Sequence, residues 1–144
     1  EQRGEDSIIA DTGSIKDAPE LFGGGLPSSC LYVTQEFMRK NPQTVQSLCD
    51  AVVRALKWLQ TAGPGDILKT VPEAHLAGDR ALFLAAFDRS REGISPDGLM
   101  PDGGARTARR ALWALGAIAR PELIDLSLTY TNEFAQRAKE KFRA

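Results

Sequence analysis

The spacing of the apolar residues changes near Asn41, and this change constrains the fold more than any other feature of the sequence. Before it, residues 7–10 form a short apolar run and residues 31–37 alternate with β-branched and aromatic side chains, which predicts two strands. After it, apolar residues recur at helical spacing, which predicts four or more helices. Two strands cannot make a complete parallel sheet. We therefore expect an α/β protein whose remaining strands lie outside these 144 residues.

The first long helix has clear signals at both ends. Asn41 is a favourable N-cap and Pro42 suits the first helical position, whereas Gly63-Pro64-Gly65 interrupts the periodic pattern. The apolar stripe between them predicts an inward face, on which Leu56 should be deeply buried. The members of this stripe are Val45, Leu48, Cys49, Val52, Val53, Leu56 and Leu59.

Further helices follow, each with its own boundary residues. Asp79 can cap one of them, and another follows residues 101–104 and is broken by Pro121. Thr131 or Asn132 can cap the last. We expect these helices to be stable only with the missing N-terminal part of the same protein, or with a partner that replaces it. Without such a cover, apolar side chains would be exposed to water at Val52, Leu56, Leu82, Phe87 and Leu112.

The charge balance argues against two classes of protein. The chain has 18 basic and 19 acidic residues and a formal net charge of -1, which does not favour binding to nucleic acid or to an anionic membrane. No apolar stretch approaches the ~18 residues that would span a bilayer. The first six residues are hydrophilic and are not a signal peptide, although this does not fix the compartment.

The residues that usually carry metal or acid–base chemistry are sparse. His75 is the only histidine, and neither Cys30 nor Cys49 lies near it in sequence, so we expect no metal site and no cofactor. Both cysteines are predicted to be free, buried thiols. No Gly-x-Ser-x-Gly motif accompanies the histidine, and the sequence therefore predicts no catalytic residue.

Several segments resemble motifs of one protein family, in the order in which that family has them. Residues 41–59 resemble its Asn-Pro helix ending in Ala-Leu-Lys-Trp, and residues 95–101 resemble its S-x-D-G-x-x-P turn. Residues 124–134 resemble its closing D-x-S-x-T-Y-T-N-x-F segment, and residues 4–12 resemble a strand that precedes the second crossing between lobes. The family is that of the solute-binding proteins of ABC importers for nitrate, alkyl sulfonates and taurine.

The resemblance implies a fold and a division of the chain. It implies an α/β fold of the type II periplasmic-binding-protein class, with two lobes and a ligand cleft between them. Residues 1–28 would be the end of the second lobe and a hinge loop. Residues 29–144 would be the return strand into the first lobe and the C-terminal helices.

The resemblance also implies a function without catalysis. The protein would bind a small anionic or zwitterionic solute, such as an alkyl sulfonate, taurine or nitrate, and deliver it to an ABC permease in the membrane. Its location would be periplasmic, or extracytoplasmic with a membrane anchor. Two alternatives stay open, because the fold family also includes enzymes, such as sulfinate desulfinases and thiamine-pyrimidine synthases, and ligand-sensing domains of regulators.

Two segments are candidates for ligand contact. The turn formed by Asp11, Thr12, Gly13 and Ser14 offers hydroxyl and amide donors to an anion, although a turn with purely local hydrogen bonds fits it as well. In the loop of residues 23–29, Gly24 and Ser28 could line the floor of a cleft that bends at this loop. An exposed loop without ligand contact is the other interpretation.

Overall fold

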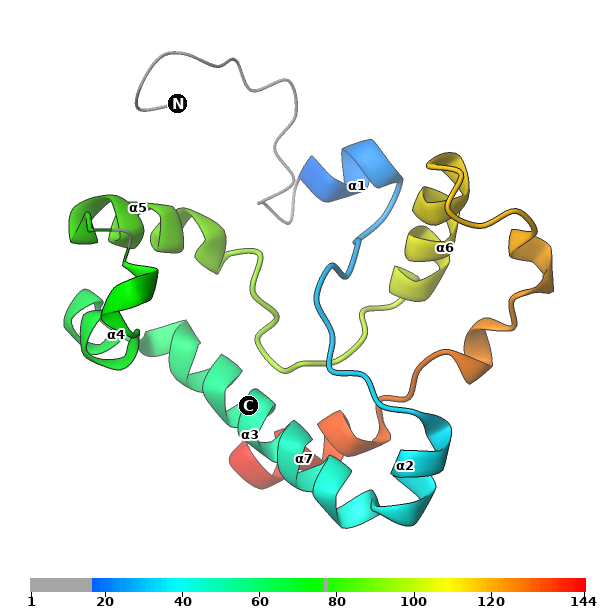
Figure 1. Ribbon diagram of the computed structural model, residues 1–144, viewed down its shortest axis with the longest axis horizontal. Coiled ribbons are helices and arrows are strands. Elements are labelled where there is room, and N and C mark those ends of the chain that lie inside the picture. Colours follow the sequence, from blue (N-terminus) through cyan, green and yellow to red (C-terminus); the bar gives the residue numbers. More distant parts are fainter. Residues whose placement is uncertain (1–16, 77) are drawn as a thin grey trace.

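The described part of the chain is helical (Figure 1). The computed structural model describes residues 17–76 and 78–144, and no strand occurs in them. Short 3₁₀ helices lie at Glu73–His75 (η1), Pro121–Leu123 (η2) and Leu126–Leu128 (η3). The α-helices are α1 (Asp17–Phe22), α2 (Gln35–Lys40), α3 (Pro42–Thr61), α4 (Pro64–Thr70), α5 (Arg80–Arg91), α6 (Gly104–Ala114) and α7 (Glu133–Phe142).

The predicted α/β fold of the two-lobed periplasmic-binding-protein type is wrong for these residues, and residues 31–37 show why. The backbone is extended only as far as Thr34, whose side chain accepts a hydrogen bond from the Phe37 amide at 3.1 Å and caps α2. An ion pair of 2.6 Å between Lys40 and Glu36 stabilises the same short helix. The alternating pattern of residues 31–37 therefore covers both an extended segment and the first residues of α2. The strand predicted at residues 7–10 lies outside the described residues.

The helix starts predicted from capping residues are confirmed, but the predicted end of α6 at Pro121 is wrong, because α6 ends at Ala114 and Pro121 begins η2. Helix α3 begins at Pro42, and the Asp79 carboxylate accepts from the Leu82 amide at 2.9 Å at the start of α5. Helix α6 follows Gly103, whose φ of 74° would strain any residue with a side chain. Helix α7 follows Asn132.

The principal packing in the described part is between α3 and α7, which lie side by side in Figure 1. Val45 and Val53 of α3 and Phe134 and Ala138 of α7 are buried. Polar pairs fix the register of the two helices. Gln46 donates to the Phe134 carbonyl at 3.0 Å, and Lys141 pairs with Asp50 at 2.5 Å. Hydrogen bonds from Lys141 and from Gln46 hold the pKa of Asp50 below its ordinary value, although partial desolvation opposes them.

The arrangement leaves much apolar surface open. The chain exposes 10772 Å², against about 7,200 Å² for a compact monomer of 15.6 kDa. Val52, Leu82 and Leu112 are exposed, and these are among the side chains that we expect the missing N-terminal part or a partner to bury. Leu56 is half-buried, so the prediction that it is deeply buried is wrong, and Val53 takes that place at 1% exposure.

Candidate functional site

The three motif segments, residues 41–59, 95–101 and 124–134, meet in space. The Asn132 side chain makes two hydrogen bonds to the backbone of Met100, accepting from its amide at 2.9 Å and donating to its carbonyl at 3.2 Å. One amide side chain thus pairs with both polar groups of a residue 32 positions away. The Gln46 bond to Phe134 joins the first segment to the third. These three segments therefore form one packed unit, and the fourth segment that carries the resemblance, residues 4–12, lies outside the described residues.

An ion pair strengthens this unit. Lys139 of α7 contacts the Asp97 carboxylate at 2.7 Å, and the same carboxylate accepts from the Leu99 amide at 3.1 Å. Desolvation raises the pKa of Asp97, but the hydrogen bonds from Lys139 and Leu99 outweigh it and hold this pKa below its ordinary value. Asp97 therefore caps the backbone of its own turn. Its pairing with Lys139 was not predicted.

The turn around Gly98 packs on α3. The φ of Gly98 is 73°, and its amide donates to the Ser95 hydroxyl at 2.9 Å. A Cβ at this position would lie 3.3 Å from both Leu56 Cδ1 and Val53 Cγ2. Glycine is therefore needed here for its backbone conformation and for its small size. The contacts of these segments are those of a packed scaffold, in which the buried Gln46 Oε1 has no hydrogen-bond partner among the described residues.

The predicted ligand-contact residues do not share one site in the described part of the chain. Asp11, Thr12, Gly13 and Ser14 lie outside the described residues. Gly24 lies against α6, because a Cβ on it would come within 2.6 Å of the Thr107 hydroxyl. Ser28 is exposed and makes no hydrogen bond with another described residue. Gly24 is thus a close-packing residue.

This packing gives a testable pair of substitutions. We expect Gly24→Ala to lower the free energy of unfolding by about 1–3 kcal/mol, because the added methyl group meets a hydroxyl whose residue is only 5% exposed. Gly25→Ala is the matched control, since a Cβ at Gly25 has nothing within 4 Å. Both changes restrict the unfolded chain equally. Chemical denaturation measures the difference, and equal stability of the two variants would show that the loop does not approach α6.

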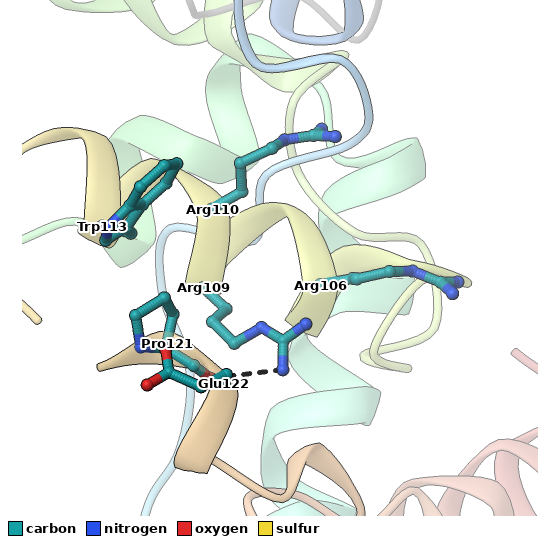
Figure 2. Close-up of a pocket in the computed structure, with 6 residues that line it drawn as sticks. All are labelled: Arg106, Arg109, Arg110, Trp113, Pro121 and Glu122. Atoms are coloured by element: carbon teal, nitrogen blue, oxygen red, sulfur yellow. Dashed lines mark hydrogen bonds between the residues drawn. The ribbon is translucent and has the colours of Figure 1, made fainter. Parts of the chain in front are cut away.

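A hollow lined by charged side chains lies beside α6, and we call it the α6 hollow (Figure 2). Its volume is about 290 Å³. Arg106, Arg109, Arg110 and Trp113 follow one another at the i, i+3, i+4 and i+7 positions of the helix and so share one side of it. The hollow is lined by Arg106, Arg109, Arg110, Trp113, Pro121 and Glu122.

The three arginines of the α6 hollow differ in the hydrogen bonds that their side chains make. Arg109 points toward η2 and donates to the Pro121 and Ile124 carbonyls at 3.4 and 3.3 Å (Figure 2). Arg110 donates to the Phe22 carbonyl, which connects α6 to the loop that contains Gly24. Arg106 is exposed and makes no hydrogen bond or ion pair with another described residue. A guanidinium has five N–H donors, so an anionic group could be bound here, with an apolar part against Trp113.

The thiols and the histidine do not form a reactive site in the described part. Cys30 is exposed, so the prediction that both thiols are buried is wrong for it, while Cys49 is half-buried and both are free. Burial raises the pKa of the Cys49 thiol, and the neighbouring Asp50 carboxylate raises it further, which is the opposite of what a nucleophilic thiolate needs. No group of three or more potential metal ligands occurs among the described residues. None of the helices described is long and apolar enough to cross a membrane.

Comparison with known proteins gives one solved structure that is similar. No model of a known protein family matches the chain, and no curated protein matches it. A solved structure of a protein from Bordetella bronchiseptica RB50 shares 45% sequence identity with it, at a TM-score of 0.90. The match covers 99% of this chain and 45% of that one, so the chain spans less than half the length of the Bordetella protein. The helical arrangement is therefore one that a solved protein adopts within a longer polypeptide.

Proposed function

We propose that this chain belongs to a protein that binds a small organic anion reversibly and delivers it to a membrane permease. The observation that carries the proposal is the convergence of residues 41–59, 95–101 and 124–134 into one unit. Motif matches that arise by chance have no reason to contact one another across the chain. These three do, so we take their resemblance to motifs of the solute-binding family as support for the proposed function. The proposal concerns function and does not restore the α/β fold.

The chemistry of the α6 hollow supports an anionic ligand. Three arginines line it, although their guanidinium groups point in different directions in Figure 2, in a chain whose formal net charge is only -1. A volume of about 290 Å³ lies at the lower end of the ~300–1,000 Å³ usual for ligand pockets, which suits a small solute. Trp113 supplies an apolar surface for the carbon part of an alkyl sulfonate.

A binding role fits the described side chains better than catalysis does. Proton transfer or covalent attack needs a nucleophile beside a base, or a group whose pKa is moved toward neutrality. The residues that line the α6 hollow are arginine, tryptophan, proline and one glutamate, and this lining holds no serine, cysteine, lysine or histidine that could act as a nucleophile. Arginine stays protonated at neutral pH and binds anions without exchanging protons with them.

Isothermal titration of the 144-residue protein with taurine, ethanesulfonate and nitrate tests the proposal. We expect saturable binding of at least one of them, and recovery of the ligand unchanged by mass spectrometry. Arg106→Ala should weaken that binding about tenfold, because one charged hydrogen bond contributes about 1.5 kcal/mol. Arg39→Ala on α2 is the matched control, since it removes an equal charge from an exposed position outside the hollow.

Three outcomes would contradict the proposal. Conversion of the ligand would indicate an enzyme. If the Arg106→Ala and Arg39→Ala variants bound the ligand equally well, the α6 hollow would be ruled out as the binding site. If none of the three solutes bound, sulfonates and nitrate would be ruled out as the ligand class.

A further inference from the structure

One side of α3 is apolar and open, and we call it the open face of α3. Leu48, Val52 and Trp58 on it are 41%, 42% and 38% exposed, and the two alanines beside them are exposed as well. Spacings of three and four residues place these side chains on adjacent rows of one helix surface. The open face consists of Leu48, Ala51, Val52, Ala55 and Trp58.

The open face is hollowed and bordered by a cation. A depression of about 380 Å³ is lined by Ala51, Arg54, Ala55 and Trp58. The two alanines are the small side chains of this lining. Arg54 makes no hydrogen bond or ion pair with another described residue, so its guanidinium is available to a partner.

The other sides of α3 are already occupied. Val45 and Val53 are buried, Gln46 and Asp50 pair with α7, and Gly98 lies against Val53. The same helix therefore has one covered apolar side and one open apolar side. An exposed row of large apolar side chains beside a hollow is typical of an interaction surface.

We propose that the open face of α3 is the docking surface for a further layer of the same longer polypeptide. That layer would be apolar, and it would carry a carboxylate opposite Arg54. The Bordetella structure is the observation that favours this occupant, because it contains the same helical arrangement and more than half of its chain lies outside the match. A segment on the same chain has a high effective concentration at the face, whereas a second copy must associate from solution.

A chimaera provides the test. In it, this chain replaces the matching 45% of the Bordetella protein, and its stability is compared with that of the 144-residue chain alone. Val52→Asp should lower the midpoint of thermal unfolding of the chimaera by about 8 °C, because the docked face would bury a charge. The same substitution should change the midpoint of the separate chain by less than about 2 °C, since Val52 is exposed to water there.

Two further variants keep the test decisive. Gln43→Asp adds the same charge to an exposed position in the first turn of α3 and should leave both proteins unchanged within about 2 °C. Arg54→Glu reverses the charge at the border and should destabilise the chimaera selectively, even if the Val52→Asp chimaera does not fold.

The outcomes show which segment or molecule packs on the open face of α3. A midpoint for Val52→Asp that falls equally in both proteins would mean that α3 is covered within this chain, and would overturn the proposal. Dimerisation of the 144-residue chain that Val52→Asp abolishes, with an unchanged chimaera, would assign the face to a second copy. Because these measurements use no ligand, their failure is distinct from failure of the proposed solute binding.

Discussion

Replacing Asn132 by leucine is expected to lower the free energy of unfolding by about 3 kcal/mol, since two partly buried hydrogen bonds are lost together. The Met100 amide and carbonyl both pair with this one side chain, and leucine leaves both without a partner. Leucine keeps a similar volume, so the loss reports on the hydrogen bonds more than on a cavity. Urea denaturation followed by circular dichroism measures it.

Asn41→Leu is the control for this prediction. Asn41 also lies directly before a helix, but its side chain is exposed and makes only a 3.3 Å bond to the Phe37 carbonyl. Its replacement should cost about 1 kcal/mol or less. If the two leucine variants were equally stable, the pairing between residues 95–101 and 124–134 would not stabilise the protein.

The second large effect is expected at Gly98, where alanine should cost about 3 kcal/mol. Part of this cost is conformational, because a φ of 73° is unfavourable for a residue with a Cβ. The rest is steric, because the methyl group would lie 3.3 Å from side-chain carbons of Val53 and Leu56. Thermal unfolding of the purified variant, followed by calorimetry, gives the total.

Gly78 allows the two parts to be separated. Its φ is 74°, but a Cβ there has nothing within 4 Å. Gly78→Ala should therefore show the conformational cost alone, about 1 kcal/mol. The difference between the two variants measures how closely the 95–101 turn packs on α3. A difference near zero would mean that the turn does not contact this helix.

The helices were predictable because their signals are local. Asn41-Pro42 marks a helix start by backbone geometry that involves only neighbouring residues, and Asp79 does the same through one carboxylate. The error at residues 31–37 has a local cause too. Alternation over seven residues cannot be distinguished from an extended entry into a capped helix, because both place Thr34 in the β region.

The contacts of the candidate sites were harder to predict. The pairing of Lys139 with Asp97 joins residues 42 positions apart, and no spacing rule connects them. Gly24 was assigned to a flexible loop, since nothing in the sequence indicates that Thr107 lies beside it. The arginines of α6 had a detectable signal, the i, i+3, i+4 and i+7 spacing of Arg106, Arg109, Arg110 and Trp113.

The most direct test of the account is amide hydrogen exchange of Met100 in the 144-residue protein, followed by NMR. If the three motif segments form one unit, its amide is held by the Asn132 side chain and should exchange about 10³-fold more slowly than in an unstructured peptide. The Val53 amide in α3 provides the internal reference for a stable helix. Slow exchange at Met100 that is lost in Asn132→Leu is the predicted result. Exchange at the rate of a free peptide, while Val53 stays protected, would contradict the account.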